Sequence, residues 1–462
     1  MQIRVYNTLT RELEEFKPSN GNNVRAYVCG LTVYADMHIG HARTYIAFDS
    51  IFRYLRSRGY PVKYVQNITD IDDKIIDKAL AEGVNPAKLT SNYIQRMIED
   101  QEILGLMRPD EYPKVSEYIP QIISAVQSLM DKGHAYPAGG NVYFRVKSFQ
   151  DYGRLSRQDL DRLTKHRIRL DECKEDPLDF AVWKNVSDDS LSFESPWGRG
   201  RPGWHIECSV MAQALLGDEI DIHGGALDLV FPHHENEIAQ SQALTGRPFV
   251  KYWLHTGFLY SSGEKMSKSL GNIMSVRDFL AEYDADTLRL FVLQTHYRSQ
   301  INYDKDHILA AGNAVERLRQ FKQRLSKATG QQGGRDDRIG EAAEELKRGF
   351  HEAMSEDFNT PNALSVLFTK VRKINTLLDE GDQAPGSIRH AREVFSEVTG
   401  ILGLALDAEA DIPDDVLGSI AERDRLRAEK RWDEADKIRD TLSRNGFRLV
   451  DGPDGSTRAE RA

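Results

Sequence analysis

His38-Ile39-Gly40-His41 decides the fold, because a strand is expected before this stretch and a helix after it. The strand is predicted over Val24 to Cys29 and the helix over His41 to Arg58, which precedes a glycine. The apolar face of this helix comprises Ile46, Ala47, Ile51, Phe52 and Leu55. A second strand is predicted over Pro61 to Asn67. Strand, helix and strand form a βαβ unit with parallel strands. The sequence therefore predicts an α/β fold with a Rossmann-like parallel sheet.

A second short segment, Lys265-Met266-Ser267-Lys268-Ser269, follows another predicted strand over Tyr252 to Tyr260. The ammonium groups of its two lysines, with His38 and His41 at a helix start, can stabilise negative charge on phosphates. Gly40 has no Cβ, so a nucleotide can approach the backbone closely. Each segment alone is as often a capped helix or a solvated loop. The ordered pair, each behind a strand, favours a site that activates a carboxylate with ATP.

Two cysteines and a helix start offer ligands for a metal ion. Cys29 ends the first strand, and Cys208 closes a Trp-His-Ile-Glu-Cys segment. His233 and Glu237 are four residues apart and share one helical face, although His234 is also within reach of Glu237. Taken alone, such a pair is more often the solvated face of a capped helix. Two thiolates, an imidazole and a carboxylate nevertheless form a suitable tetrahedral zinc set.

Composition limits the classes of protein. The chain has 462 residues, and its 40% hydrophobic and 29% charged composition is that of an ordinary globular protein. Its net charge of −10 argues against generic coating of nucleic acid but does not exclude a local basic face. Three to five modules are expected for about this length. The sequence has no run of about eighteen apolar residues, so we expect no membrane span. The start, Met1 to Val5, has no leader pattern, and three cysteines cannot form a disulfide framework. These features predict a cytoplasmic protein.

Beyond Asp284 the chain is predicted to be mostly helical. Asn359-Thr360-Pro361 is typical of a helix start, with Thr360 as N-cap and Pro361 at the first position. Apolar residues then recur at intervals of three and four: Leu364, Leu367, Val371, Ile374 and Leu378. This spacing predicts one face of a helical bundle.

The last part of the chain is predicted to be a small α+β module behind an acidic linker, residues 407–415. Helices are expected over Ser419 to Arg431 and Asp433 to Arg444, followed by a short hairpin. A basic stripe on the first helix comprises Arg423, Arg427, Lys430 and Arg431. Trp432 is expected to pack the two helices together, or else to stack on a base. From the residues alone, a solvated helix pair is slightly favoured over an RNA-binding surface.

The chain resembles the cysteinyl-tRNA synthetases, a class I aminoacyl-tRNA synthetase family. The resemblance rests on motifs in order along the chain: Tyr27 to Gly30, His38 to His41, Asn67 to Lys74, Asp176 to Lys184, Arg201 to Cys208, Phe231 to Glu237 and Lys265 to Ser269. Residues 354–364 and 421–455 are also similar to that family. The match covers nearly the whole chain.

The resemblance implies roles for particular residues. Cys29, Cys208, His233 and Glu237 would be the zinc ligands, and Thr69, Trp204 and His223 would bind the amino acid. Lys268 would contact ATP together with His38, Gly40 and His41, and Lys265 would assist catalysis. The basic stripe would bind tRNA.

The resemblance also implies an activity. The chain would use ATP with Mg²⁺ to activate L-cysteine and would transfer it to the 3′ end of tRNA(Cys). One zinc ion per chain would select the substrate thiol, and the protein is expected to be a monomer.

The implied domains follow the same order. They are a Rossmann-like catalytic domain (1–115 and 200–256), a connective insertion (116–199), a KMSKS-loop and stem-contact region (257–310), a helical bundle (311–406) and an anticodon-side tRNA-binding module (414–462).

Two alternatives remain open at this point. A related ligase could join cysteine to an amino sugar, but such a relative is expected to lack the terminal module. An inactive paralogue could bind RNA without catalysis, but the two phosphate-binding segments and all the expected zinc ligands are intact.

Overall fold

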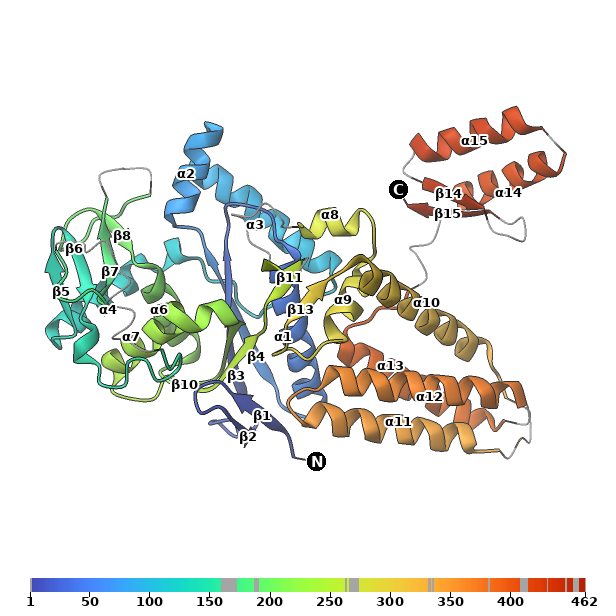
Figure 1. The fold of residues 1–462 in the computed structure, drawn as a ribbon, viewed down its shortest axis with the longest axis horizontal. Coiled ribbons are helices and arrows are strands. Elements are labelled where there is room, and N and C mark those ends of the chain that lie inside the picture. Colours follow the sequence, from blue (N-terminus) through green and yellow to red (C-terminus); the bar gives the residue numbers. More distant parts are fainter. Residues whose placement is uncertain are drawn as a thin grey trace.

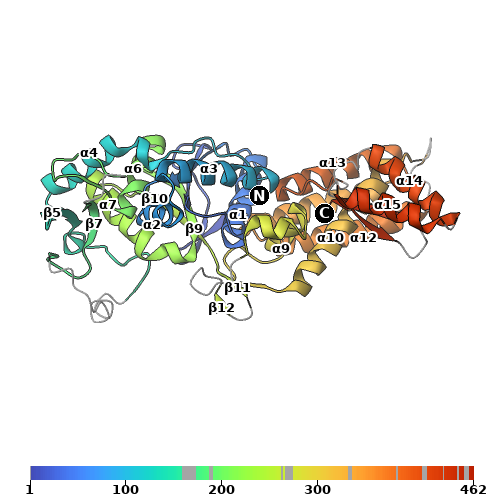
Figure 2. The same ribbon diagram turned by 90° about the horizontal axis from the view of Figure 1, so that it is seen from above.

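The computed structural model describes residues 2–158, 173–186, 191–261, 264–265, 274–330, 334, 336–380, 383–407, 414–429, 431–444, 447–451 and 457–461. Figure 1 shows a central sheet with an insertion on one side and long helices on the other. Seen from above, the molecule is elongated, with the insertion and the C-terminal module at opposite ends (Figure 2).

The central sheet has four strands, and every neighbouring pair is parallel. Its elements are β3 (Val24–Thr32), β4 (Val62–Thr69), β9 (Ile220–Ala226), β10 (Val250–Thr256) and the connecting helix α1 (Ile39–Ser57). The strand order is β10-β9-β3-β4, and α1 links β3 to β4. The parallel sheet and the βαβ unit predicted from the sequence are confirmed.

Side-chain alternation along β3 assigns its residues to the two faces of the sheet. Ala26 and Val28 belong to the hydrophobic cluster that contains α1. Tyr27 and Cys29 belong to a second cluster, together with two further helices, α6 (Trp204–Leu216) and α7 (Glu235–Thr245). Successive strand residues point to opposite faces, and a parallel sheet is covered on both. Cys29 therefore faces α6 and α7.

The insertion contains helix α4 (Ile119–Asp131) and an antiparallel sheet of its own. The strands of that sheet are β5 (Ala135–Ala138), β6 (Asn141–Phe144), β7 (Phe180–Asn185) and β8 (Gly200–Pro202). Before it come α2 (Asp73–Glu82) and α3 (Pro86–Ile103), and an N-terminal hairpin is formed by β1 (Arg4–Asn7) and β2 (Glu12–Glu15). The hairpin lies beside β10, where the Thr8 N–H donates to the Trp253 carbonyl at 2.9 Å.

The strand predicted over Tyr252 to Tyr260 is divided in two. β10 ends at Thr256, and a new strand, β11 (Leu259–Ser261), joins a separate sheet with β12 (Glu264–Lys265) and β13 (Ile301–Tyr303). Gly257 lies at the break, where an added Cβ would be 2.4 Å from the Ser299 carbonyl oxygen. The prediction of one continuous strand is wrong because the chain turns there against a distant backbone segment.

The helical part follows in sequence and packs on the central domain. Its helices are α8 (Val276–Leu280), α9 (Ala285–Leu293), α10 (Lys305–Lys327), α11 (Arg338–Ser355), α12 (Thr360–Glu380) and α13 (Pro385–Leu402). Leu364, Leu367, Val371 and Ile374 are buried, as predicted from their spacing, whereas Leu378 of the same predicted face is only partly buried. One continuous core joins α1 to this bundle, which fixes the bundle against the Rossmann-like domain (Figure 1).

The N-cap of α12 differs from the prediction. Asn359, not Thr360, caps the helix, because its Oδ1 accepts the N–H of Asn362 at 3.1 Å. The Asn359 carbonyl also accepts the N–H of Ala363 at 3.1 Å. Asparagine is among the best N-cap residues, and this bond satisfies one otherwise unpaired N–H.

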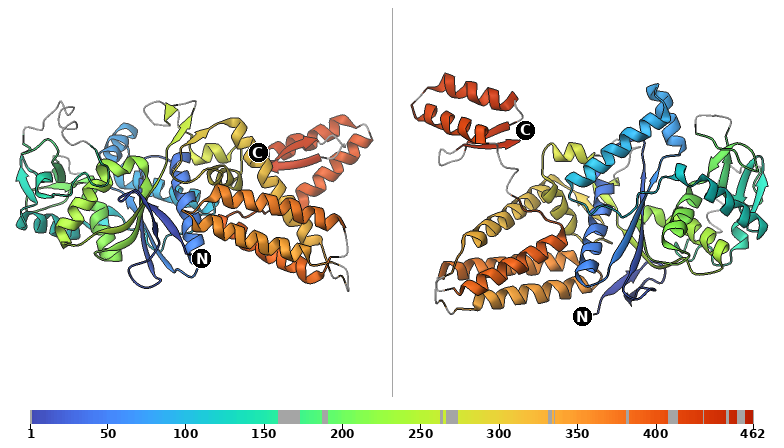
Figure 3. Two further views of the ribbon diagram at one scale, coloured as in Figure 1. Left: turned by 60° about the horizontal axis from the view of Figure 1, so that its bottom comes forward. Right: turned by 180° about the vertical axis from the view of Figure 1, so that it is seen from behind.

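The C-terminal module stands apart from the bundle, as the right-hand view of Figure 3 shows. It contains α14 (Asp414–Ala428), α15 (Trp432–Arg444), β14 (Phe447–Asp451) and β15 (Thr457–Arg461), with the two strands antiparallel. The predicted pair of helices and hairpin is confirmed, although α14 begins earlier than expected. Among the described residues, no helix has the length and apolar character needed to cross a bilayer.

Replacing the α12 cap gives a first testable prediction. Asn359→Ala should weaken the start of the helix by about 1 kcal/mol, or about fivefold in local opening, because the Asn362 N–H loses its acceptor. Hydrogen–deuterium exchange of the Asn362 and Ala363 amides measures this opening. Asn359→Ser, which retains a capping oxygen, is the matched control and should exchange as the unmutated chain does. Equal exchange in the alanine variant would contradict the assignment of the cap.

Candidate active site and metal centre

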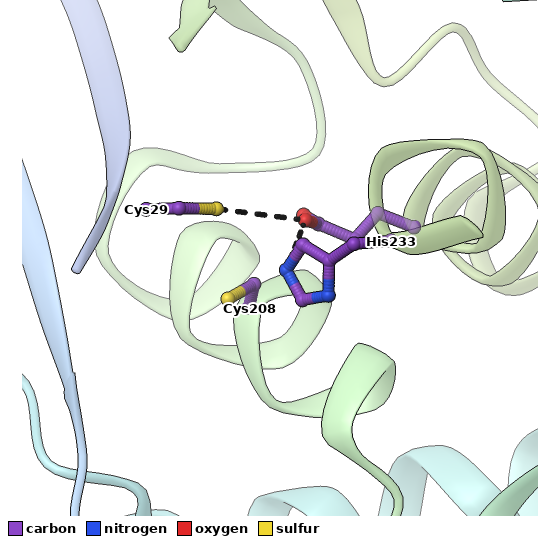
Figure 4. Close-up of side chains that lie close together, drawn as sticks. Cys29, Cys208 and His233 are labelled. Carbon is purple, nitrogen blue, oxygen red and sulfur yellow. Dashed lines mark hydrogen bonds and ion pairs between the residues drawn. The ribbon is translucent and has the colours of Figure 1, made fainter. Parts of the chain in front are cut away.

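The four predicted metal ligands lie together in the structure. Cys29 comes from β3, Cys208 from α6, Glu237 from α7 and His233 from the short helical turn η4 (Val230–His234). All four are buried, with Glu237 0% exposed, and one ligand atom from each lies within 4.8 Å of the others. Figure 4 shows the Cys29, Cys208 and His233 side chains converging. Residues far apart in sequence thus form one compact donor cluster.

Helical spacing explains half of this cluster. His233 and Glu237 are four residues apart, and Glu237 Oε1 lies 2.9 Å from His233 Nε2 and 3.9 Å from Cys29 Sγ. The other Glu237 oxygen, Oε2, lies 2.8 Å from Nε2 of His223 on β9. The donor set of sulfur, nitrogen and oxygen is suited to a zinc-like ion. The cluster could therefore hold a metal ion.

Electrostatics favour the anionic form of two of these donors, Cys208 and Glu237, whereas burial raises the pKa of the Cys29 thiol well above its usual value. A hydrogen bond from Cys29 and the nearby His233 lower the pKa of Cys208 to about 6, against the effect of burial. Burial would raise the pKa of Glu237, but His223 and His233 hold that pKa at about 2. Burial likewise opposes protonation of His233, yet Glu237 and Cys208 raise its pKa to about 10. Two donors are therefore anionic, the form that binds metals, and His233 must release a proton to become a ligand.

His234, which the spacing left open, belongs to a second possible set. Cys29, His223, His234 and Glu237 also place one ligand atom each within 4.8 Å. Nε2 of His234 is 3.3 Å from Cys29 Sγ, and its Nδ1 is 2.7 Å from Nε2 of His255. Both sets use Cys29 and Glu237, so they describe two positions for one ion. The set with Cys208 has two sulfur donors and fits a soft ion better.

The residues expected to bind the amino acid surround the cluster. The Trp204 ring lies 4.3 Å from the His233 ring, and His223 contacts Glu237 as above. Thr69, at the end of β4, donates from Oγ1 to Glu207 Oε2 at 3.5 Å. Trp204 is exposed, with 39% of its surface accessible to solvent. The structure therefore brings Trp204 and His223 to the donor cluster. It brings Thr69 to Glu207, the residue before the donor Cys208.

Sequence reasoning missed three residues of this region. Nδ1 of His205 lies 3.0 Å from Nδ1 of His233, and His255 supports His234. Glu207 is buried, and burial raises its pKa well above the usual value. His205 and Glu207 lie three residues and one residue before Cys208, and this closeness in sequence to a candidate ligand was the available signal. His255 gave none, because only the sheet register brings it close.

The first phosphate-binding segment forms the start of α1. The His38 and His41 rings stack at 3.4 Å, and His38 Nδ1 accepts the His41 N–H at 3.2 Å. Ile39 donates its N–H to the Met274 carbonyl at 3.1 Å, so the chain beyond the lysine segment returns to this helix start. Gly40 lies between the histidines, where a Cβ would be 3.0 Å from the His38 ring. The two histidines are thus brought together as predicted.

The lysine segment is only partly described. The backbone of Lys265 lies in β12, where it pairs with Tyr260 of β11. The Lys265 side chain and the whole of Lys268 fall outside the described residues. Their contact with phosphate stays a prediction.

A cavity of about 540 Å³ lies beside His255, and its lining includes none of the donor residues. His255 forms one wall, and Arg11, Asp228 and Arg298 add charged side chains. The N-terminal hairpin and the insertion add further walls through Tyr6, Thr8, Leu155, Ser156 and Gln158, and the segment after β9 completes the lining with Leu227, Val230 and Phe231. The cavity therefore approaches the second donor set through His255, whose Nε2 lies 2.7 Å from Nδ1 of His234.

Comparisons with known proteins agree with this geometry. The family described as tRNA synthetases class I (C) catalytic domain matches residues 15–313, and the DALR domain matches residues 349–407. The cysteine–tRNA ligase of Thermococcus gammatolerans is 47% identical over 99% of this chain and 98% of that protein. The cysteine–tRNA ligase of Carboxydothermus hydrogenoformans is 47% identical over 98% of this chain and 99% of that protein. The chain belongs to the cysteine–tRNA ligase family.

Solved structures support the same fold. The methionyl-tRNA synthetase of Mycobacterium tuberculosis, solved with methionyl-adenylate, superposes with a TM-score of 0.60 at 16% identity. The superposition covers 82% of this chain and 89% of the methionyl-tRNA synthetase chain. The Agrobacterium radiobacter K84 agnB2 LeuRS, solved in a ternary complex, superposes with a TM-score of 0.60 at 13% identity, over 85% of this chain and 85% of that one. At these identities the likeness shows the class I synthetase fold alone.

In this member of the family, the predicted tRNA-binding stripe is engaged within the module. Arg423 is 4% exposed and donates to Thr457 Oγ1 at 2.7 Å, and Arg427 reaches the same oxygen at 3.4 Å. Arg431 forms an ion pair with Glu434 at 2.7 Å. Lys430 falls outside the described residues. A role of these residues in tRNA binding stays a prediction.

Trp432 does not pack the helix pair together. It is 56% exposed at the start of α15. The packing role expected from the sequence is therefore wrong, and stacking on a base stays a prediction.

The donor cluster gives a prediction for metal content. Loss of a residue that hydrogen-bonds to a metal ligand typically lowers metal affinity by roughly 10–100-fold. Cys208→Ser should lower metal affinity by more than this, because it removes a ligand itself. Elemental analysis of the purified chain after dialysis measures the loss. Cys173→Ser is the matched control, since Cys173 is exposed and outside both donor sets. A full complement of metal in Cys208→Ser would contradict the ligand set.

Proposed function

We propose that the chain is a cysteine–tRNA ligase that uses ATP and Mg²⁺. The observation that carries this proposal is the buried cluster of Cys29, Cys208, His233 and Glu237, in a member of this family whose α1 begins with His38 and His41. L-cysteine would be the amino acid and tRNA(Cys) the acceptor. Zinc is the proposed ion, one per chain.

The proposed reaction has two steps. A carboxylate oxygen of cysteine attacks the α-phosphorus of ATP, the bond to the bridging oxygen breaks, and pyrophosphate leaves. The terminal ribose hydroxyl of tRNA then attacks the carbonyl carbon of the adenylate, AMP leaves, and the hydroxyl proton is released. Negative charge develops on the phosphoryl oxygens in the first step. The positive end of α1, with His38, His41, Lys265 and Lys268, would stabilise that charge.

Selection of the amino acid is proposed to occur at the donor cluster. Cysteine and serine differ by one atom, and shape alone discriminates by about 1–3 kcal/mol. When bound, zinc would supply a soft Lewis acid that prefers a thiolate to a hydroxyl oxygen. Trp204, against the His233 ring, would limit the size of the side chain, and His223 would orient Glu237 through Oε2. Thr69 would complete the amino-acid pocket.

The terminal module supports tRNA as the acceptor over an amino sugar. α14, α15 and the hairpin form a folded unit with buried Val416, Ile420 and Leu442. A ligase for a small acceptor has no use for a unit so far from the donor cluster. The exposed Trp432 offers a ring on which a base can stack.

The decisive experiment measures the exchange of pyrophosphate into ATP with each amino acid added in turn. Cysteine should support exchange, and serine should not do so at equal concentration. Exchange that needs a different amino acid would overturn the proposed substrate. The absence of exchange with every amino acid would favour an inactive paralogue.

Lys268 gives a prediction for the first step. Lys268→Ala should slow adenylate formation by about a hundred- to thousandfold, or roughly 2.7–4 kcal/mol, because one preorganised charge is lost. Cysteine affinity should change little, since the thiol would be bound at the donor cluster and Lys268 would contact the phosphates. Single-turnover kinetics separate the two quantities. Lys88→Ala, an exposed lysine on α3, is the control. A rate within about threefold of the unmutated chain would refute this role.

The terminal module gives a prediction for the second step. A chain ending at Asp407 should keep cysteine activation but should charge tRNA poorly at subsaturating tRNA. The linked module packs around its own small cluster, so its removal leaves the catalytic core intact. Salt should weaken charging by the full chain more than charging by the truncated one, because phosphate contacts are lost with the module. Equal charging by both chains would contradict the tRNA-binding role.

A further inference from the structure

The turn between α11 and α12 has an unusual backbone. Asp357 and Phe358 are consecutive non-glycine residues with φ of 56° and 52°. Side chains rarely adopt this left-handed conformation, and surrounding contacts must hold such residues in place. Both are buried, with 4% and 1% of their surfaces exposed. The turn is therefore held in a strained form by its neighbours.

The Asp357 carboxylate contacts two distant segments. Its Oδ1 accepts the N–H of Tyr6 at 2.8 Å and the hydroxyl of Tyr297 at 2.7 Å. Its Oδ2 accepts Nε–H of Arg298 at 2.6 Å. The Arg298 guanidinium also lies over the Tyr6 ring, 4.3 Å from the centroid. One carboxylate of the bundle thus binds the N-terminal strand and the segment after α9.

The Asp357 backbone makes contacts with the same two segments. Its N–H donates to the Arg4 carbonyl at 2.9 Å, and its carbonyl accepts from His296 Nε2 at 3.0 Å. Three polar groups of Asp357, its two carboxylate oxygens and its carbonyl, therefore bond directly to residues 296–298, and its N–H bonds to Arg4. The strained φ values are the geometry that lets backbone and side chain reach both segments.

Residues 296–299 lead directly to the strand that supports the lysine segment. The Gly257 N–H donates to the Tyr297 carbonyl at 2.9 Å. Residue Ile301 of β13 pairs with Leu259 of β11, and Tyr260 of β11 pairs with Lys265 of β12. A displacement of residues 296–299 would therefore move β11 and, with it, β12.

The start of α1 holds the same segment from the other side. Arg43, two residues after His41, is 1% exposed. Its guanidinium donates to the carbonyl of Gly257 at 2.5 Å, to that of Tyr297 at 3.3 Å and to that of Ser299. The helix that carries the two histidines is therefore fixed to the segment that Asp357 binds.

We propose that Asp357 is a positioning residue for adenylate formation. From the bundle it fixes residues 296–298 against Arg43, and so sets the distance between Lys265 on β12 and the histidines at the start of α1. This inference rests on the proposed function, in which those groups stabilise phosphoryl charge. A carboxylate in the helical bundle then controls the rate of the first step without touching ATP.

The test uses two substitutions that keep the backbone conformation. Glycine and asparagine both tolerate positive φ, so Asp357→Gly removes the carboxylate, and Asp357→Asn keeps its shape without the charge. Glu356→Gln, on an exposed neighbour paired with Arg4, is the control. Asp357→Gly should lower kcat of pyrophosphate exchange by about tenfold or more, because small misplacements of reacting groups cost up to a hundredfold. Asp357→Asn should give an intermediate rate.

The expected pattern differs from that of simple loss of folded protein. KM for cysteine should stay within about twofold, and metal content should be unchanged, because the donor cluster is not displaced. Near-ultraviolet circular dichroism compares the folded fraction of each variant. If the loss of rate matches a loss of folded protein, or if KM for cysteine rises with it, Asp357 has a structural role only and the inference is wrong.

A double-mutant cycle with Lys265→Ala tests the route of the effect. If Asp357 acts by placing Lys265, Asp357→Gly should lower the rate much less in the Lys265→Ala background than in the unmutated one. Fully additive losses would overturn the inference. Exchange by the unmutated chain is measured first, and its absence would refute the proposed function. Exchange that is present but unaffected by Asp357→Gly would refute this inference alone.

Discussion

The carboxylate of Glu237 has no solvent contact, and a buried charge is unfavourable unless other groups compensate it. Two imidazoles do so, one on β9 and one on η4, while the Cys29 thiol of β3 approaches the same oxygen pair. These partners can meet only if β3 and β9 are neighbours and if α7 begins over that face of the sheet. The strand order of the central domain and the burial of Glu237 are therefore one constraint. Removing the carboxylate would leave a histidine cluster without its balancing charge.

Sequence patterns predicted the elements whose residues interact locally. The βαβ unit follows from helical periodicity between two apolar strands, and Leu364 to Ile374 follow from the same rule. The break at Gly257 could not be predicted, because it depends on the Ser299 carbonyl in another part of the chain. The N-cap of α12 was misplaced by one residue, since Asn359 and Thr360 are both good capping residues.

The candidate site shows the same division. Spacing of three and four residues left His233 and His234 as alternatives, and the structure finds both in buried donor sets. His255 enters through sheet register, which no local pattern encodes. Arg423 was assigned to a solvent-facing stripe, yet the hairpin strand β15 covers it. Long-range pairing therefore accounts for most of what the sequence could not provide.

The separation of the C-terminal module has a consequence for the concentration at which it acts. Six residues, 408–413, lie between Asp407 and the start of α14. The seven Cα-to-Cα steps from Asp407 to Asp414 span at most ~25 Å at about 3.6 Å per step. The module therefore stays near the end of α13, at an effective concentration on the order of millimolar relative to the catalytic body. An RNA that engages one part meets the other without a second encounter from solution. Weak contacts in a small module can then add to affinity without a large interface of their own.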